Sequence, residues 1–253
     1  MKDLRTPLAW DFLAQFPSLE RAQQASPLDV LKVFRTHARR PPEQLAALGD
    51  EIRTARPLTT DRATIDSSVP MVEILIEQLR ALGAGIERVE RQVAELFTAH
   101  PDREIFQNFP GAGKALAPRL LAAWGSDRQR FQDAAQMQTF AGPAPVTVRS
   151  GKSQWVHRRF ACPTFLCQTF HEFAAQSCLR SPGAKAYYQQ MRRKGSDHHP
   201  AIRALAFKWV RIMFRCWQDR TPYAEARYQQ ALNRRGSPLA KNLGQLPIPL
   251  AHS

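Results

Sequence analysis

The chain has 253 residues, of which 43% are hydrophobic, and a formal net charge of +14. That hydrophobic content excludes wholesale disorder, and no apolar run approaches the roughly 18 residues of a membrane span. Residues 1–100 carry 13 basic and 14 acidic side chains, whereas residues 101–253 carry 23 basic and 8 acidic ones. A strongly basic region favours a polyanionic partner, and the lack of an amphipathic anchor or lipidation signal favours nucleic acid over an anionic membrane.

The four cysteines form no CxxC pair and have no ligand-like spacing with histidine; they are Cys162, Cys167, Cys178 and Cys216. This usage is typical of reduced thiols in a cytosolic protein, so we do not expect them to bind metal. No cofactor is expected in this chain. The first 25 residues alternate charged and apolar side chains and do not resemble a signal peptide.

Residues 1–58 are predicted to form a small helical module. The segment LAWDFLAQF ends at Pro17, Ser26 suits the N-cap of the next helix, and Pro41 and Pro42 suit the first turn of a third.

Residues 59–100 are predicted to form one long helix with a heptad repeat. Eight apolar residues alternate in spacings of three and four, as in a coiled coil. They are Val72, Leu75, Leu79, Leu82, Ile86, Val89, Val93 and Leu96. The helix could pack on its own core, pair with another segment of the chain or self-associate into a dimer or tetramer. Dense Glu and Arg at the other positions favour pairing or self-association, although Gly83 and Gly85 each weaken the helix by about 1 kcal/mol.

Residues 101–235 are predicted to form a mainly helical domain. The expected helices are Lys114–Trp124, Asp133–Phe140, Pro163–Arg180, Ala184–Lys194, Ala201–Trp217 and Pro222–Asn233. Strand-like content is confined to 144–148 and 154–160, which predicts one β-hairpin with Ser150 and Gly151 at its tip. The expected fold class is therefore mainly α with one small β-hairpin, and residues 236–253 are expected to form a loose tail.

A Gly-x-Gly turn precedes the first of these helices. Gly111 and Gly113 permit positive φ angles, and with Lys114 beside them the turn amides and the helix N-terminus could hold a phosphate. The pattern resembles the hairpin of a helix-hairpin-helix motif, which grips a nucleic-acid backbone. The alternative is a plain glycine turn between packed helices.

The expected helix Ala201–Trp217 carries Lys208, Arg211 and Arg215 at spacings that place them on one face. Such a purely basic stripe suits phosphate contact, the alternative being an ordinary solvated face. The preceding residues Ser196–Pro200 contain two histidines, but their spacing favours an N-cap over a metal site.

The predicted hairpin concentrates cations around one hydroxyl. Ser150 lies among Arg149, Lys152, Arg158 and Arg159, and His157 is the nearest candidate base. A serine becomes a nucleophile when a base takes its proton or when cations stabilise the developing charge. A Ser-Gly step is equally ordinary turn chemistry. The pattern alone leaves Ser150 as either a turn residue or a nucleophile.

The order of motifs resembles a known family. FPGAG, an alanine-rich helix, AGPAPV, SGK, FHEFAAQS, AYY and ALAFKWVRI follow one another as in the C-terminal transposase domain of bacterial insertion-sequence transposases of the DEDD type, which are guided by a bridge RNA. The resemblance covers nearly the whole chain, with residues 104–235 matching the transposase domain. It implies that Ser150 attacks a DNA phosphodiester. It also implies DNA and a guide RNA as partners and a place on the bacterial nucleoid.

The sequence departs from this family in two places. The family begins with a RuvC-like domain whose four acidic residues hold divalent metal, and this sequence starts where that domain is expected to have ended. Its early acids do not lie in the matching motifs, and none is assigned to metal: Asp3, Asp11, Glu20 and Asp29. Mg²⁺ is therefore expected only together with a RuvC-like domain. The second departure is Gly142-Pro143, where a bulky apolar residue is expected after the glycine.

Two functions follow from these expectations. In the first, the chain is a transposase component that binds DNA but recombines it poorly without the metal half of the site. In the second, it is a non-catalytic module, descended from such an enzyme, that binds nucleic acid and oligomerises.

Overall fold

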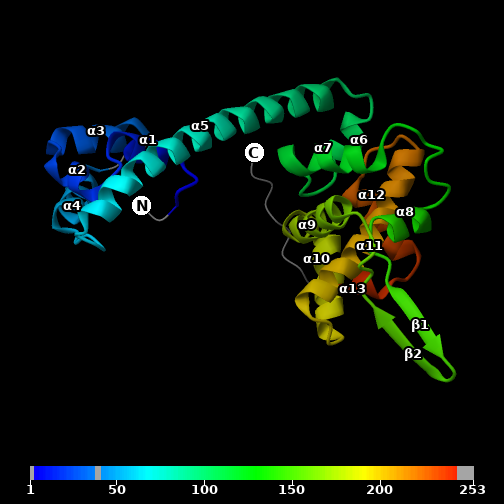
Figure 1. Cartoon of the computed structure of the whole chain (residues 1–253). Helices are drawn as coiled ribbons and strands as arrows, with labels where there is room; N and C mark the ends of the chain where they lie inside the picture. The colour runs from blue at the N-terminus through cyan, green and yellow to red at the C-terminus, as the bar shows by residue number, and fades with distance from the viewer. Residues whose placement is uncertain (1–2, 38–40, 244–253) are drawn as a thin grey trace. The chain divides into compact units, whose positions relative to one another are not determined.

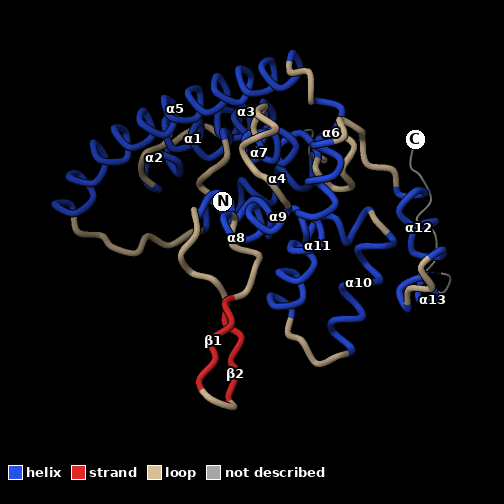
Figure 2. Tube along the Cα trace, turned by 90° about the vertical axis from the view of Figure 1, so that its right-hand side faces the viewer, coloured by secondary structure: helices blue, strands red, loops and turns tan. Residues whose placement is uncertain are grey.

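The computed structural model describes residues 3–37 and 41–243, which fall into two compact units, 1–92 and 93–253. Helices dominate both units, and the described residues contain one two-stranded antiparallel sheet (Figures 1 and 2). The expected fold class, mainly α with one small β-hairpin, is confirmed. No described helix has the length and apolar character that a bilayer crossing requires.

The first unit begins with four short helices: α1 (Pro7–Gln15), α2 (Leu19–Gln24), α3 (Pro27–His37) and α4 (Pro42–Thr54). The N-cap predicted at Ser26 is present, since its hydroxyl accepts from the Asp29 amide, and the Ser18 hydroxyl accepts from the Arg21 amide at the start of α2. Phe12, Phe16 and Phe34 pack together at the centre of this unit. The short α2 was not expected from the sequence.

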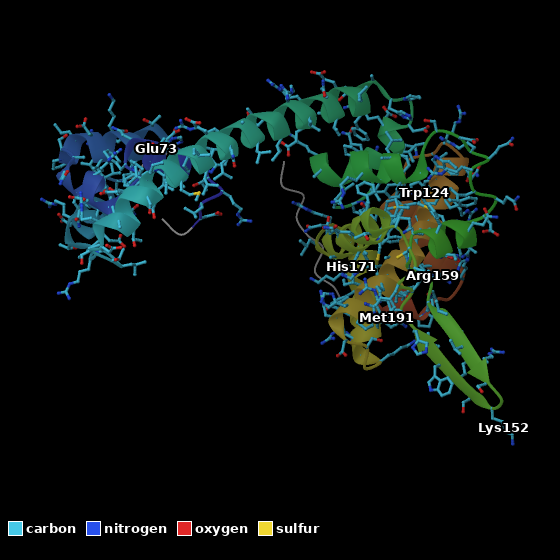
Figure 3. All side chains as sticks on the ribbon, viewed as in Figure 1. Glu73, Trp124, Lys152, Arg159, His171 and Met191 are labelled. Atoms are coloured by element: carbon cyan, nitrogen blue, oxygen red, sulfur yellow. The ribbon has the colours of Figure 1, made fainter. Side chains whose placement is uncertain are left out.

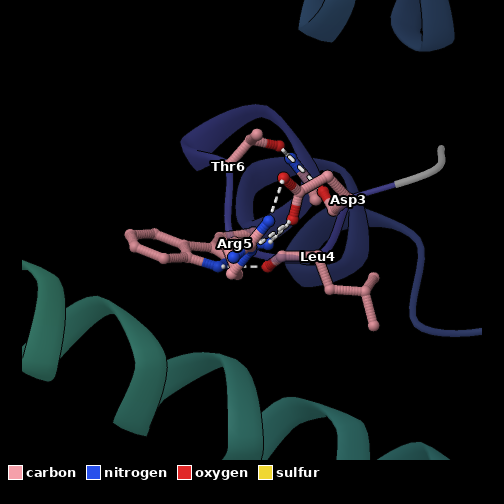
Figure 4. Close-up of polar contacts among 6 residues, drawn as sticks. Asp3, Leu4, Arg5 and Thr6 are labelled. Atoms are coloured by element: carbon pink, nitrogen blue, oxygen red, sulfur yellow. Dashed lines mark hydrogen bonds and ion pairs between the residues drawn. The ribbon is translucent and has the colours of Figure 1, made fainter. Parts of the chain in front are cut away.

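The N-terminal turn contains Asp3, Leu4, Arg5 and Thr6 (Figure 4) and contacts the start of α1. Thr6 Oγ1 accepts from the Ala9 amide at 3.3 Å, and the Trp10 indole donates to the Leu4 carbonyl at 2.8 Å. The indole ring lies against Gly83 of α5, where a Cβ atom would come within 2.8 Å of two ring carbons. Gly83, which weakens the helix intrinsically, therefore allows it to approach Trp10.

Helix α5 (Arg62–Ala99) is continuous, as the heptad pattern predicts. The first unit covers a face of it that contains buried Ile76 and Gly83, and Arg80 of α5 forms an ion pair with Asp11. The heptad residues lie on another face. Seven of the eight are exposed: Leu75, Leu79, Leu82, Ile86, Val89, Val93 and Leu96. Within the described residues, these seven apolar side chains are thus exposed.

The second unit contains the remaining helices: α6 (Arg103–Gln107), α7 (Gly113–Trp124), α8 (Ala134–Phe140), α9 (Thr164–Arg180), α10 (Pro182–Arg193), α11 (His198–Gln218), α12 (Glu225–Arg234) and α13 (Pro238–Leu243). Its core gathers large aromatic side chains around α11. The Trp209 indole donates to Ser177 Oγ, and the Trp217 indole donates to the Gly125 carbonyl, each at 2.8 Å. These hydrogen bonds satisfy polar groups that burial would otherwise penalise.

A buried ion pair lies at one edge of this core. Arg128 donates to both carboxylate oxygens of Asp102 at 2.6 and 2.8 Å, and its guanidinium lies 4.8 Å from the Trp217 ring centroid. Their side chains are only 16% and 9% exposed. The hydrogen bonds from Arg128 lower the pKa of Asp102 more than burial raises it.

The expected loose tail is partly helical. Helix α13 occupies 238–243, packs against α10 and contains the buried Leu239. Tertiary packing of α13 on α10 is long-range context, which the local sequence pattern did not reveal. Residues 244–253 lie outside the described residues.

Candidate functional site

The predicted hairpin projects from the helices of the second unit (Figure 2). Strands β1 (Val146–Ser150) and β2 (Ser153–His157) are antiparallel, and Ser150 pairs with Ser153. Gly151 and Lys152 form the turn between them, with φ +56° at Gly151, a value that favours glycine. Ser150 is therefore the last residue of β1, one position before the turn in which it was expected.

The register decides which side chains share a face with Ser150. Directly paired residues of an antiparallel ladder point to the same side, so Ser150, Ser153, Val148, Trp155 and His157 lie on one face. Arg149 and Gln154 lie on the other face. The sequence placed Arg149 and Ser150 together at the tip, but alternation along β1 separates their side chains.

The same register separates His157 from Ser150. His157 is four residues beyond the cross-strand partner of Ser150, a separation of about 13 Å along the strand. A general base must come within about 3 Å of the proton that it takes, or act through one water. In this hairpin geometry His157 does not act as the base for Ser150.

Trp155 was missed by the sequence analysis. It lies on the Ser150 face, is paired with Val148, and is 52% exposed. An exposed indole on a strand is a platform on which an unpaired base can stack. A tryptophan within a short basic strand is the sequence signal that could have identified it.

The cations expected around Ser150 lie at the two ends of the hairpin. Arg149 and Lys152 are exposed at its outer end, whereas Arg158 and Arg159 follow β2 at its root. Figure 3 shows Lys152 at the tip and Arg159 next to the helices. The Arg159 Nε donates to the Ala144 carbonyl at 3.3 Å, which ties the two arms together.

The Gly-x-Gly turn connects α6 to α7, and its two glycines differ in role. Gly111 has φ +85°, and a Cβ there would lie 2.8 Å from the Gln176 backbone of α9, so close packing requires glycine. Gly113 has φ +55° with open space around it, and it is exposed together with Lys114. The plain packing alternative therefore accounts for Gly111, while Gly113 and Lys114 remain accessible at the start of α7.

Helix α11 presents its three expected cations unequally. Arg211 and Arg215 are exposed, but the Lys208 ammonium lies 4.4 and 5.2 Å from the ring centroids of Tyr187 and Tyr228. Burial lowers the pKa of Lys208 to about 8. Helices α10 and α12 thus cover a side chain that spacing along α11 placed with the other two.

The adjacent histidines begin α11. Asp197 holds the N-cap position, without a side-chain capping hydrogen bond, and Pro200 lies in the first turn. His198 Nδ1 lies 2.9 Å from the Tyr188 hydroxyl, and His199 Nδ1 lies 3.3 Å from His171 Nε2. Across residues 3–37 and 41–243, no three His, Cys, Asp or Glu side chains converge in a way that could hold a metal ion.

The second unit is thus a mainly helical, strongly basic domain with an exposed hairpin that carries a serine between cations. Residues 103–189 of this unit match the model of the transposase family described as IS116/IS110/IS902. The matched segment contains both strands of the hairpin.

Three curated proteins of insertion elements are similar to this chain. The chain is 36% identical over 153 residues to the "Mini-circle putative transposase for IS117" of Streptomyces coelicolor, covering 60% of this chain and 37% of that protein. It is 30% identical over 168 residues to the IS110 uncharacterized 43.6 kDa protein of the same organism, covering 63% and 39%. It is 29% identical over 157 residues to the IS900 uncharacterized 42 kDa protein of Mycobacterium paratuberculosis, covering 62% and 39%. The chain therefore spans less than two fifths of the length of these relatives.

Proposed function

We propose that this chain acts in DNA transposition, with its second unit binding DNA and Ser150 attacking a DNA phosphodiester. The observation that carries the proposal is the transposase match over 103–189, which includes the exposed hairpin and its serine. The net positive charge of 101–253 supports a DNA-binding role, because phosphate contacts by Lys and Arg supply most of the non-specific affinity.

The proposed step is a transesterification. Ser150 Oγ attacks phosphorus and forms a new P–O bond, while a sugar oxygen leaves with the bonding electrons and takes up a proton. The serine proton passes to a base. Lys152, in the turn that follows the serine, stabilises the additional negative charge on the phosphoryl oxygens, whereas Arg149, on the opposite face of β1, holds a neighbouring backbone phosphate. The intermediate is a covalent protein–DNA ester.

The position of His157, about 13 Å along the strand, supports a composite site. We assign the base and the metal ligands to a RuvC-like domain with four acidic residues, on this polypeptide or on another, as the family resemblance implies. Mg²⁺ bound there would supply Lewis-acid activation of the phosphodiester.

The remaining cations hold the DNA backbone in this proposal. Arg158 and Arg159 bind phosphates at the hairpin root, Arg211 and Arg215 do so along α11, and Gly113 with Lys114 offers amides and one ammonium at the start of α7. Gly111 supports this turn through packing. Lys208 contributes less because Tyr187 and Tyr228 cover it.

The exposed heptad stripe of α5 supports self-association through a coiled coil, as a dimer or tetramer. Pairing of two α5 helices would bury the seven exposed apolar residues and bring second units from different protomers onto one DNA. A guide RNA is a further proposed partner, as the family resemblance implies.

The nucleophile assignment is tested with DNA that contains the transposon end, in the presence of a RuvC-like half. Denaturing electrophoresis detects the covalent adduct. We expect Ser150→Ala to abolish the adduct and Ser153→Ala, the cross-strand neighbour on the same face, to retain it. An adduct that persists in the Ser150→Ala chain would refute the assignment.

The second candidate is a non-catalytic nucleic-acid-binding and oligomerising module, which the lack of a nearby base in the hairpin favours. It predicts that Ser150→Ala leaves every transposition readout unchanged, whereas Arg158→Glu with Arg159→Glu abolishes binding. The salt dependence of the affinity then reports the number of phosphates contacted.

A further inference from the structure

A cavity of about 540 Å³ lies at the root of the hairpin in the second unit. Its walls come from the loop of Gly142 and Pro143, the segment after β2, and helices α9 and α11. Gly142 has φ +90°, and a Cβ there would lie 2.5 Å from Cys162 Sγ, so the loop backbone lies directly against the cavity wall. Ligand pockets are typically about 300–1,000 Å³, which suits a nucleotide better than a lone phosphate.

Three arginines line this cavity without a carboxylate partner. In the part of the chain that the structure describes, Arg158, Arg159 and Arg203 take part in no ion pair. The lining residue Glu172 is engaged by Arg119 at 2.5 Å. Burial and the positive charge of Arg158 lower the pKa of Arg203. Uncompensated guanidinium groups around a concave surface are arranged to bind a phosphate.

The same cavity has flat, weakly polar walls. Phe160 is 79% exposed and lies 5.4 Å, centroid to guanidinium, from Arg158. The rings of His171 and His199 are 5.4 Å apart with an interplanar angle of 31°. Burial lowers the pKa of His171, and the neighbouring positive charges lower it further, which favours the neutral ring. Aromatic faces next to arginines are the combination that binds unpaired bases.

We propose that this cavity receives one unpaired nucleotide of the DNA strand bound at the hairpin. Arg158, Arg159 and Arg203 hold its phosphate, and its base lies against Phe160 and the His171–His199 pair. The inference rests on the proposed DNA-binding function. A base inside a duplex cannot enter such a cavity, so the nucleotide is single-stranded or flipped out of the stack.

The position of the cavity indicates that its nucleotide comes from the same DNA strand that Ser150 attacks. Arg158 is five residues beyond Ser153, the partner of Ser150, a path of about 17 Å along β2. That path corresponds to about five nucleotides at the 3.4 Å rise of a stacked strand. The cavity would thus hold a nucleotide a few positions from the reacting phosphate and set the register of that strand.

Two thiols in the cavity wall provide a test without mutation. Cys162 and Cys167 line the cavity, whereas Cys178 and Cys216 lie on α9 and α11 outside its lining and serve as internal controls. The full chain is pulsed with N-ethylmaleimide, with or without a saturating single-stranded 20-mer or its blunt duplex, and alkylation is read by mass spectrometry. We expect the single strand to slow alkylation of Cys162 and Cys167 at least fivefold and to leave the alkylation rates of Cys178 and Cys216 unchanged. The duplex should slow alkylation of Cys162 and Cys167 less than the single strand does.

Three results would overturn the inference. The first is unchanged thiol reactivity at saturating single strand, and the second is equal protection by the duplex. The third is protection by the matching RNA 20-mer at lower concentration than by DNA, which would assign the cavity to RNA. A chain that binds neither single strand nor duplex would instead contradict the proposed function itself.

A matched pair of variants separates the cavity from general electrostatics. Arg203→Met and Arg211→Met each remove one guanidinium from α11, but only Arg203 lines the cavity. We expect Arg203→Met to weaken single-strand binding about tenfold, the loss of one charge-assisted phosphate contact, with duplex affinity within about twofold. It should also abolish thiol protection. Arg211→Met should weaken both DNA forms alike and keep the protection, and identical behaviour of the two variants would refute the cavity assignment.

Discussion

The Asp102–Arg128 pair predicts a large and pH-dependent loss of stability when the arginine charge is removed. Arg128→Met keeps much of the side-chain stem beside Trp217 but deletes both hydrogen bonds to a carboxylate that is 9% exposed. Leaving one member of a buried pair without its partner typically costs about 3–5 kcal/mol. For a unit of this size that corresponds to a decrease of about 10 °C in melting temperature.

The pH dependence identifies the cause. In the native chain the pKa of Asp102 is lowered, so the stability supplied by the pair is present above the unfolded-state value and is lost only as pH falls through the lower folded value. In Arg128→Met the hydrogen bonds and charge of Arg128 are lost, and burial, which has a larger effect on this carboxyl than either His100 or Arg220, is expected to raise the pKa of Asp102. Acidification towards pH 4 then neutralises the unpaired carboxylate, and the difference in melting temperature from the native chain should shrink.

Tryptophan fluorescence measures the relevant transition, because Trp124, Trp155, Trp209 and Trp217 all lie in the second unit. Arg193→Met, at an exposed position in α10, controls for loss of one surface charge. The double variant Arg128→Met with Asp102→Ala should be more stable than Arg128→Met alone, because no buried charge remains. The reasoning would be refuted if Arg128→Met had the same melting temperature as the Arg193→Met control. It would also be refuted if the double variant were less stable than Arg128→Met.

Three further predictions concern packing, burial and assembly. Gly111→Ala should lower the free energy of unfolding by more than 2 kcal/mol, because a positive φ costs about 1–2 kcal/mol and the new Cβ would also collide with α9. Gly113→Ala, which has a positive φ but open space around it, should cost only about 1 kcal/mol. Equal losses of stability in urea denaturation would contradict the packing role of Gly111. Lys208→Met should stabilise the chain by roughly 1–3 kcal/mol at pH 7, because a buried ammonium is removed. The gain in stability should vanish as pH rises from about 8 towards 10, and thermal melts at about pH 7 and pH 10 test this direction. Leu82→Glu with Val89→Glu should convert an oligomer into a monomer in sedimentation without lowering the melting temperature of the first unit, while Arg88→Glu, off the heptad stripe, should leave the oligomer intact.

Local signals predicted much of this fold because they act within a few residues. Ser26 and Asp133 cap the helices that follow them, and the heptad spacing predicted one long helix over 59–100, which α5 forms from Arg62 to Ala99. Short helices such as α2 and α6 were missed because five or six residues carry too little periodicity. The expected start of α10 was two residues late, since Ser181 caps the helix and Pro182 begins it.

The candidate site was harder to predict because it depends on register and on distant packing. Ser150 is separated from Arg149 because it belongs to the strand and not to the turn, and it is separated from His157 because it pairs with Ser153. No residue type specifies that register by itself. The cavity joins Gly142, His171 and Arg203, which only the packing of α9 and α11 brings together. Burial of Lys208 likewise depends on Tyr187 and Tyr228 from two other helices.

The exposure of the hairpin predicts that it opens more readily than the helices of the second unit. Nine of its ten strand residues are exposed, and an isolated two-stranded hairpin is marginally stable in water. Its amides should therefore exchange with solvent far faster than those of α11, and DNA binding should slow that exchange. A one-residue slip in pairing would also rotate Ser150 to the opposite face. Gly151, by favouring one turn, thus helps to maintain the orientation of the proposed nucleophile in a hairpin that we expect to open locally.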